Sequence, residues 1–494
     1  MKFVKSSVFI VLALLWCVAL STCSPAKQED DGTDLLGNGN DSGVRIGWAK
    51  VDISPTPEML PMDMAGRSFH TIVNSIHVND DGTSDNLFAT ALAIKSSDGS
   101  QAVLVSLDLI MLGYTGSNDD PEGLLEHVRE RVTADGFDTD MLILFATHSH
   151  NSPLLVDQYY SNLPEGQSLT ENDPRIRTWG AAYTEYITPL IAQAVDEAWA
   201  SMDYGSLSYV NAVNEVGWNR ISTYSCGHAV INGVQGFCPI CYDEGMFTGF
   251  EARDNRDMPL IYTFDAAGEL TGVVLNPGFP FHTTLEEKEM SADVMSAIRS
   301  RLNEFGLDIY TLTIIGAAGD QAPYLCGRPV PSGGLGWIQK TTVGNCVADV
   351  IKMHIDNGDY LINKASDIVM GHKVEMLYLE KRTPTEEFPE FLVELHAIRL
   401  GDIAVVNNPF ELYVDLGDEI KEASKASMTV VGQLSSTFKS DSYGALYVPT
   451  ERAVEGGAYG SANGPCGPAA GHMLATSSAA LINSLFGIDG LQSN

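Results

Sequence analysis

A pair of histidines directly after a short apolar segment is the strongest chemical signal in this sequence. Residues 141–146 read MLILFA, and Thr-His-Ser-His follows, with His148 and His150 as its two imidazoles. Enzymes with an α/β fold often present ligands and reactive groups where a buried strand ends. Side chains alternate along an extended chain, so the two rings point in opposite directions unless the loop bends. Taken alone, the pair fits hydrogen-bonded loop histidines as well as a metal or catalytic site.

Three further apolar segments also end in polar loops. Each leads to one candidate side chain: 272–276 to His282, 311–315 to Asp320, and 404–407 to Glu411. The small residues around Asp320 permit a close approach of backbone and ligand. Glu411 is expected to start a helix, and by itself it fits a carboxylate favoured by the helix dipole.

The elements that must position these loops alternate between strands and helices. The continuous apolar runs 103–108 and 141–146 are typical of strands buried on both faces. Between them, apolar residues recur at helical spacing from Leu124 to Val132. This strand–helix–strand order indicates an α/β layered fold. Similar patterns predict helices near 183–202, 292–305, 347–355 and 412–423, and strands near 311–315, 393–399 and 404–407.

The N-terminal region predicts an exported protein. Two lysines precede an apolar run, residues 8–20, which is too short to cross a bilayer comfortably and is followed by Leu-Ser-Thr-Cys23. This ending is similar to a bacterial lipobox, so residues 1–23 are expected to be an export signal. The expected product is a periplasmic or cell-surface lipoprotein attached to the membrane through a lipid on Cys23, with simple secretion as the alternative. Residues 24–43 are predicted to be a flexible acidic tether, and 44–487 the catalytic domain.

Charge restricts the partners of this chain. It has 29 basic and 64 acidic side chains, and its formal net charge is −35. Such a surface repels phosphate backbones and anionic head groups, so nucleic acid is not expected as a partner. The oligomeric state is left open.

Cysteine chemistry is the other feature that depends on export. Six cysteines follow the N-terminal region: Cys226, Cys238, Cys241, Cys326, Cys346 and Cys466. Outside the cytoplasm an even number favours disulfides. Cys238-Pro-Ile-Cys241 could instead be half of a zinc knuckle, but a second Cys-x-x-Cys does not follow it in the sequence. Disulfides are therefore expected, with their pairing open.

The order of the motifs resembles that of the neutral/alkaline ceramidases. Thr-His-Ser-His-x-Ser-Pro, Asn-Arg220, the strand before His282, Ser-Ala-Asp, Gly-Asp-x-x-Pro and Pro-Phe-Glu occur in the family's order. The stretch from Gly-Trp-Ala-Lys-Val-Asp-Ile to Ser-Leu-Asp is also similar, and the resemblance spans about 44–486. It implies one large α/β catalytic domain, with a buried mixed sheet flanked by helices and a zinc centre at strand ends.

The resemblance also implies the ligands of that zinc ion. They are His148, His282, Glu411 and Tyr447, where Tyr447 belongs to the Tyr-Val-Pro-Thr motif and Tyr459 is the rival phenol. Two imidazoles, a carboxylate and a phenolate form a plausible donor set for Zn²⁺, with room for a water molecule. Zinc would activate that water at neutral pH.

Four further residues receive roles from the resemblance. His150 is implied as the proton shuttle, a role that suits an imidazole. Arg220 is implied to polarise the substrate carbonyl or to hold an anionic group. Asp320 and Tyr459 are implied to contact the substrate. A disulfide between Cys326 and Cys346 would lie at the rim of the site.

Two departures from the family pattern bear on the substrate. The family's Gly-Asp-x-Ser-Pro serine is Ala322 here, which excludes a serine nucleophile at this position and weakens ceramide as the substrate. The β-sandwich module of larger family members is also not expected in this chain. The expected activity is that of a zinc-dependent hydrolase of linear amides, with an N-acyl amide of a lipid or small molecule as substrate. The alternatives are a zinc esterase or amidase acting on a sugar or small metabolite, and a non-catalytic binding lipoprotein.

Overall fold

The computed structural model of this chain describes most of the region after the N-terminal segment. It covers residues 43–487, except for 67–70, 80, 113–122, 156–178, 234, 243–244, 286, 324–335, 385, 387–388 and 437–445. The predicted export signal and all but the last residue of the predicted tether therefore lie outside the described residues. None of the helices in the described part combines the length and the hydrophobicity that a membrane-spanning segment needs.

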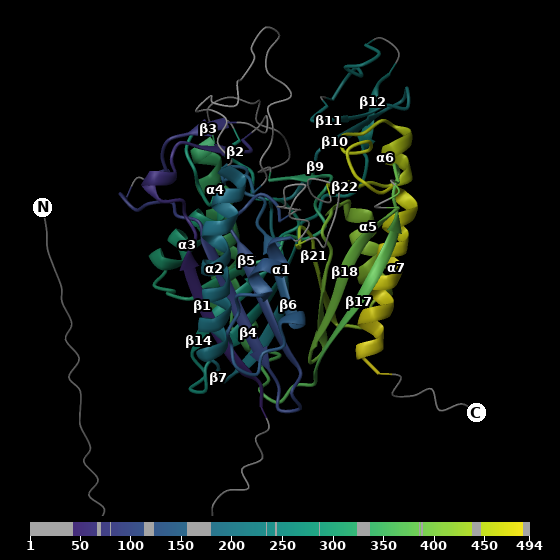
Figure 1. Cartoon of the computed structure of the whole chain (residues 1–494). Helices are drawn as coiled ribbons and strands as arrows, with labels where there is room; N and C mark the ends of the chain where they lie inside the picture. The colour runs from purple at the N-terminus through teal and green to yellow at the C-terminus, as the bar shows by residue number, and fades with distance from the viewer. Residues whose placement is uncertain are drawn as a thin grey trace, which may run out of the picture. The chain divides into compact units, whose positions relative to one another are not determined.

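Three sheets make up the framework (Figure 1). The first has the order β6 (Leu142–Ala146), β5 (Gln101–Leu107), β4 (Phe88–Lys95), β1 (Arg45–Asp52) and β7 (Asp203–Tyr204). The second has the order β15 (Tyr310–Thr313), β14 (Leu270–Leu275), β13 (Asp257–Phe264) and β8 (Ser206–Val213). The third has the order β17 (Met370–Glu380), β18 (Glu390–Leu400), β19 (Ile403–Asn407) and β21 (Met428–Gly432). Each sheet is mixed, because it contains one parallel pair: β5–β6, β14–β15 or β19–β21.

The sheets share a central apolar core and are covered by helices on their other faces. Ile143 and Phe145 of β6 belong to a core that all three sheets contribute to, whereas Leu142 and Leu144 face a core that includes helix side chains. A strand buried on both faces requires a continuous apolar run, which explains the sequence MLILFA. The covering helices are α1 (Leu124–Arg129), α2 (Trp179–Ala200), α3 (Val294–Glu304) and α4 (Gly336–Asp356) on the first two sheets.

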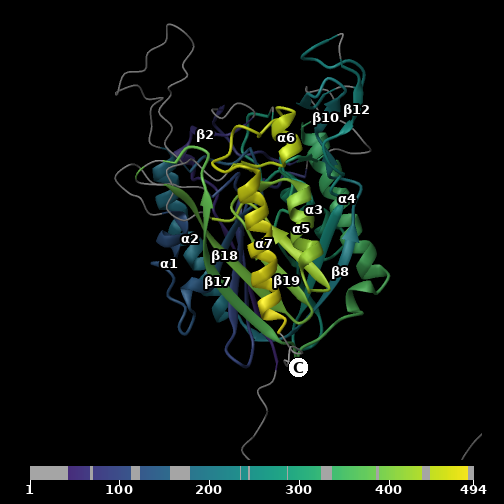
Figure 2. The same cartoon turned by 90° about the vertical axis from the view of Figure 1, so that its right-hand side faces the viewer.

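The third sheet has its own helical cover. Helices α5 (Val414–Ala423) and α7 (Pro468–Leu485) pack on it through a separate apolar cluster. Figure 2 shows α7 lying across β17 and β18. The predicted α/β class is confirmed, but the strands are divided among several sheets rather than placed in one.

Several short elements gather where the long strands end. They are β2 (Met62–Met64), β3 (Thr71–Val73), β9 (Trp218–Asn219), β10 (Ile221–Tyr224), β11 (Ala229–Ile231), β12 (Phe247–Phe250), β16 (Gln321–Ala322), β20 (Glu411–Leu412), β22 (Tyr447–Val448) and α6 (Glu451–Glu455). The prediction that Glu411 starts a helix is wrong, since Glu411 lies in β20 and the helix begins at Val414. Apolar residues recur at helical spacing after Glu411, which explains the prediction. Glu411 and Leu412 are nevertheless extended, because their backbone pairs with β22.

Strand ends from all three sheets are tied together at one end of the framework. The Asn276 side-chain amide, just after β14, donates to the carbonyl of Ile314 at 2.6 Å and to that of Val431 at 3.1 Å. The amide of Ala146, at the end of β6, donates to the carbonyl of Leu434 at 3.1 Å. The loops that follow these strands therefore meet, and they carry the candidate residues.

The disulfide prediction is not supported for four of the cysteines. Cys226, Cys238, Cys241 and Cys466 carry free thiols, and no two described cysteines lie at bonding distance. The first three lie together without a sulfur–sulfur bond. The predicted Cys326–Cys346 disulfide includes a residue outside the described part of the chain and stays a prediction.

Candidate metal centre

The loop after β6 brings the two histidines of the His-x-His pair together. His148 has a φ of 64°, in the left-handed region that non-glycine residues seldom adopt. This bend places the Nε2 atoms of His148 and His150 3.3 Å apart. Nδ1 of His148 lies 2.8 Å from the carbonyl oxygen of Ile110, and Nδ1 of His150 lies 2.7 Å from that of Gly66. Because a carbonyl oxygen only accepts, each Nδ1 carries the proton and each Nε2 presents a lone pair.

Two more electron-pair donors lie beside these lone pairs. The His282 ring centroid is 5.9 Å from that of His148 and 5.4 Å from that of His150. His282 is buried, and within the described chain neither of its ring nitrogens has a hydrogen-bond partner. Oε2 of Glu411 lies 3.5 Å from Nε2 of His148. Glu411 is paired in register with Tyr447 on the parallel strands β20 and β22, so the two predicted oxygen ligands are neighbours.

This arrangement fits a divalent cation. The lone pair of His148, the His282 imidazole that is unsatisfied within the described chain, and the buried Glu411 carboxylate are unfavourable together unless a positive centre lies between them. His148 also donates its Nδ1–H to a carbonyl oxygen, as metal-binding histidines commonly do. The residues present therefore fit the zinc ion that the sequence predicts.

Burial sets the protonation states of this cluster. It lowers the pKa of His148 to about 4 and of His150 to about 3, so both rings are neutral at pH 7 and can donate their lone pairs. Burial also raises the pKa of Glu411 and of Tyr447, the latter well above its ordinary value. A bound cation opposes these two increases because it favours the carboxylate and the phenolate.

Arg220 lies on the other side of Tyr447. Its Nη2 donates to the Tyr447 hydroxyl at 3.2 Å and to the carbonyl of Gly319 at 2.8 Å, and its Nε has no partner in the described chain. The guanidinium carbon is 5.4 Å from the ring centroid of Tyr459. Tyr459 is 40% exposed and Tyr447 is 7% exposed. Of the two phenols, Tyr447 therefore lies with the ligand cluster, and Tyr459 lies at its accessible side.

Asp320 lies behind the cluster. Its carboxylate accepts from the Asn219 side-chain amide at 2.7 Å and from the Val414 backbone amide at 3.0 Å. The residue is fully buried, and burial raises the pKa of Asp320 to about 7. This geometry fits a group that positions the Asn219-Arg220 segment and the start of α5 better than the predicted substrate contact. Ala322 is also buried, in β16, and brings no hydroxyl to the site.

The Ser-Ala-Asp motif fixes the loop that carries His282. The carboxylate of Asp293 accepts from the hydroxyl of Thr283 and, at 3.0 and 2.7 Å, from the backbone and hydroxyl of Thr284. Although Asp293 lies at the N-cap position of α3, its side chain makes no capping hydrogen bond to that helix. The Ser149 hydroxyl donates to the carbonyl of Ser291 at 2.7 Å, which links this motif to the loop of His148.

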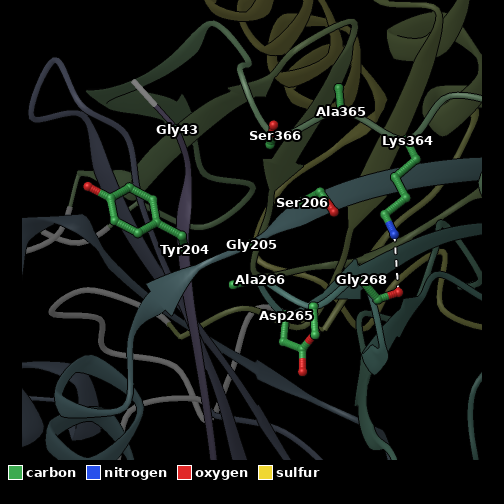
Figure 3. A pocket seen from close by; sticks show the side chains of 11 residues that line it. Gly43, Tyr204, Gly205, Ser206, Asp265, Ala266, Gly268, Lys364, Ala365 and Ser366 are labelled. Carbon is green, nitrogen blue, oxygen red and sulfur yellow. Dashed lines mark hydrogen bonds between the residues drawn. The ribbon is translucent and has the colours of Figure 1, made fainter. Parts of the chain in front are cut away.

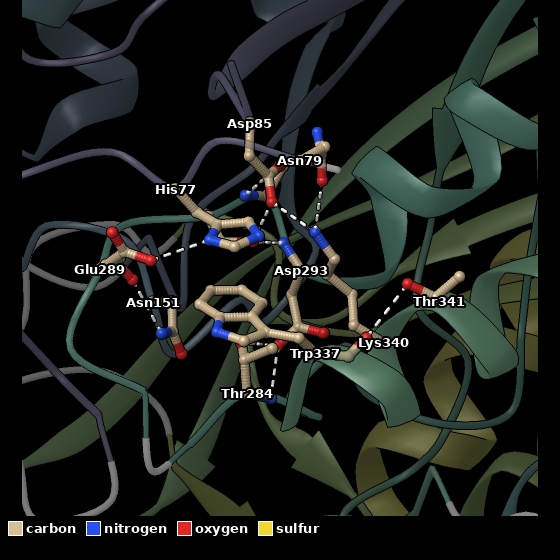
Figure 4. Close-up of polar contacts among 12 residues, drawn as sticks. His77, Asn79, Asp85, Asn151, Thr284, Glu289, Asp293, Trp337, Lys340 and Thr341 are labelled. Atoms are coloured by element: carbon tan, nitrogen blue, oxygen red, sulfur yellow. Dashed lines mark hydrogen bonds and ion pairs between the residues drawn. The ribbon is translucent and has the colours of Figure 1, made fainter. Parts of the chain in front are cut away.

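A buried ion pair between Lys340 and Asp85 contacts the Ser-Ala-Asp motif (Figure 4). Nζ of Lys340, on α4, lies 2.8 Å from Oδ2 of Asp85, and that oxygen also accepts from the Ser291 hydroxyl at 2.5 Å. Beside it, the rings of His77 and Trp337 stack with their centroids 3.6 Å apart. Sequence analysis missed Lys340, because a single lysine within an amphipathic helix carries no signal of its distant partner.

A separate hollow lies at the opposite end of the first sheet (Figure 3). It has a volume of about 560 Å³ and is lined by Gly43, Tyr204, Ser206, Asp265 and Lys364 among others. Arg45, at the start of β1, pairs with Tyr204 and with Lys95, and Lys95 pairs with Gln101 at the start of β5. The hollow is therefore at the strand starts, away from the histidines at the strand ends.

These features define an α/β protein of ceramidase-like fold with a candidate metal centre at its strand ends. Among solved structures, the neutral ceramidase of Pseudomonas aeruginosa matches with a TM-score of 0.64 and 16% identity, over 90% of this chain and 75% of that one. A structure described as ceramidase complexed with C2 matches with a TM-score of 0.62 and 14% identity, over 90% of this chain and 76% of the other. No family model and no curated protein sequence matches this chain. At these identities the likeness shows the fold alone.

Proposed function

We propose that this chain is a metal-dependent hydrolase of amide bonds, with zinc held by His148, His282, Glu411 and Tyr447. The observation that carries the proposal is the buried His282 imidazole, which has no partner within the described chain, next to His148, whose Nε2 lies 3.5 Å from the Glu411 carboxylate. The ceramidase-like fold supports an N-acyl amide as the substrate class. An ester or an amide of a small metabolite is the second candidate, because the absent hydroxyl at Ala322 removes a polar contact that a sphingoid base could use.

The protein's own groups suit amide hydrolysis. A bound zinc ion supplies Lewis-acid activation of water and of a carbonyl oxygen. His150, neutral and with its Nε2 facing the centre, accepts the proton of the attacking water and returns it to the nitrogen of the departing amine. The Nε–H of Arg220 has no partner among the described residues and can donate to the developing negative charge on the carbonyl oxygen. The products are a carboxylic acid and an amine.

Export and lipid attachment at Cys23 belong to the same proposal. They rest on the apolar N-terminal run and on the Leu-Ser-Thr-Cys ending. An anchored enzyme with an acidic surface suits an uncharged or cationic amide at a membrane surface better than an anionic one.

Metal analysis and a substrate panel test the proposal. We expect His148→Ala and Glu411→Ala to lose one equivalent of zinc relative to the parent chain, measured by mass spectrometry, and to lose hydrolysis of N-acyl amides. Matched acyl esters and acyl sugars in the panel separate the two substrate classes. An unchanged zinc content in both variants, or amide hydrolysis that persists after complete metal removal, would contradict the proposed function.

A further inference from the structure

A second cluster of soft ligands lies outside the candidate active centre. It consists of Cys226, His228, Cys238 and Cys241, and the ligand atoms of all four lie within 4.8 Å of one another. The cluster belongs to the small sheet of order β11-β10-β12, which Figure 1 shows at the end of the molecule that also carries β9 and β22. We propose that these four residues form a closed, structural zinc site that holds this small sheet together.

Two distances between ligand atoms match the edges of a coordination tetrahedron. Nδ1 of His228 lies 3.5 Å from Sγ of Cys226 and 3.6 Å from Sγ of Cys238. A tetrahedral zinc ion with ordinary Zn–S and Zn–N bond lengths places sulfur and nitrogen ligands about 3.6 Å apart. A disulfide needs two sulfurs at about 2 Å. It would also leave one cysteine of the three without a partner, whereas one metal ion uses all four residues.

The chain builds the ligand geometry from two tight turns. Cys226 and His228 lie in the turn between β10 and β11, which is closed by the Tyr224 amide donating to the His228 carbonyl at 3.0 Å. Cys238 and Cys241 lie in a second turn, closed by the Tyr242 amide donating to the Cys238 carbonyl at 2.8 Å. Spacing of Cys-x-x-Cys on such a turn is typical of structural zinc sites.

A glycine allows the two turns to approach each other. The backbone amide of Cys238 donates to the carbonyl of Gly245 at 2.8 Å. A Cβ at Gly245 would overlap Sγ of Cys226 and would come within 3.1 Å of Cβ of Cys238. A side chain at this position would therefore push the first turn away from the second.

The second turn buries little apolar surface among its described residues. Large apolar side chains of the second turn face outward: Phe237 is 59% exposed, Ile240 55%, Tyr242 71% and Met246 53%. Small units that bury little apolar surface commonly depend on a metal or a disulfide for stability. Three sulfurs and one imidazole select zinc among common divalent ions, and four protein ligands leave no open position for catalysis.

The site lies next to the candidate active centre and would position part of it. β10 starts directly after Arg220, and the Asn232 amide donates to the Arg220 carbonyl at 2.7 Å. Ala229, one residue after His228, packs in one apolar cluster with Tyr413 and Tyr447. The metal thus stabilises the segment that carries Arg220 and the surface against which Tyr447 packs.

Metal stoichiometry of the full chain tests the inference without depending on activity. The parent should bind two equivalents of zinc, and an organomercurial that titrates its thiols should release one of them. Cys238→Ser should bind one fewer equivalent, while Cys466→Ser, which changes a buried cysteine outside the cluster, should match the parent. His228→Cys should retain the ion, because four thiolates also hold zinc.

Cobalt identifies which site is affected. With Co²⁺ in place of zinc, the parent and His148→Ala should show thiolate-to-cobalt charge-transfer absorption, and Cys238→Ser should show much less. Loss of zinc in His148→Ala with this absorption intact would support both sites separately. A disulfide among Cys226, Cys238 and Cys241 in non-reduced peptide maps, or a mercurial titration that releases no zinc, would overturn the structural site and leave the active-centre proposal standing.

Discussion

At the scale of single residues, the protonation of two imidazoles decides what the candidate centre can do. His148 and His150 each donate a hydrogen bond from Nδ1 to a backbone carbonyl, so each Nε2 carries a lone pair rather than a proton. His148 also contacts Glu411, which favours it as the metal ligand. His150 is the ring that remains for proton transfer.

His150→Ala should therefore separate zinc binding from catalytic turnover. We expect the variant to keep its zinc and to lose about 10²- to 10⁴-fold in turnover, the usual contribution of a general acid–base group. The measurement is kcat on the best N-acyl amide together with metal content. If the variant loses zinc instead, the roles of His148 and His150 are exchanged.

Ala322 supplies a second prediction at this scale. Because the nucleophile is expected to be water, a hydroxyl at this position is unnecessary, and Ala322→Ser should leave kcat within about fivefold, or roughly 1 kcal/mol of activation free energy. The KM of this variant for ceramide, compared with its KM for a short N-acyl amide, shows whether the hydroxyl helps to bind a sphingoid base. A large rise in kcat for every amide would point to a missing serine nucleophile.

At the scale of elements, the loops of the centre depend on charged groups that hold helices against them. Lys340 connects α4 to Asp85, and Asp85 holds the Ser291 hydroxyl in the loop that follows His282. Removing one partner of a buried ion pair leaves an uncompensated charge.

Lys340→Met should thus destabilise the fold by about 3–5 kcal/mol, measured as the free energy of unfolding in urea. Lys352→Met, on the same helix, is the matched control. Lys352 pairs with Asp356 one turn further along α4, where Asp356 is exposed, so its loss should cost less than about 1 kcal/mol. Equal effects of the two substitutions would show that the buried pair has no special role.

The elements also show what could and could not be predicted from sequence. The runs 103–108 and 141–146 were recognisable because strands buried on both faces leave no polar gaps, and the order of the motifs pointed to the right fold. The pairing of Glu411 with Tyr447 could not be predicted, because it joins two-residue strands that are far apart in the sequence. The Cys-x-His formed by Cys226 and His228, shortly before the Cys-x-x-Cys, is the sequence signal for the proposed structural zinc site, and a search for a second Cys-x-x-Cys does not find it.

At the scale of the whole molecule, a buried polar chain joins the third sheet to the first. His372 on β17 contacts the Gln101 carbonyl at 2.9 Å and His396 at 2.9 Å. His396 contacts Glu394, and Glu394 pairs with Arg129 of α1 at 2.6 Å. Burial, and then the neighbouring His396, lower the pKa of His372 to about 3.

This histidine should make the fold sensitive to acid. The unfolded chain binds a proton at His372 near pH 6.5, whereas the folded chain does so only near its lowered pKa of about 3. Stability should therefore fall as pH decreases between these values, by up to about 1.4 kcal/mol per pH unit from this group. His372→Gln should reduce that slope in urea unfolding between pH 7 and pH 5.

His472 provides a control of opposite sign. The carboxylates of Glu419 and Glu451 raise its pKa, so its contribution is present at low pH and is lost as pH rises through the folded pKa. His472→Gln should therefore lower stability at pH 5 more than at pH 8. Identical pH profiles for the parent and both variants would exclude titration at these residues as a source of acid sensitivity.

The in-register pairing of β20 with β22 has a consequence for when the metal can be acquired. The proposed ligands extend from His148 to Tyr447 in a chain of 494 residues, and Glu411 gains its neighbouring oxygen only when β22 has paired. A chain that is synthesised from its N-terminus cannot complete the centre until the segment that carries Tyr447 has emerged. The compartment in which the last strands fold, rather than the one in which translation starts, then determines which metal ion is available to occupy the site.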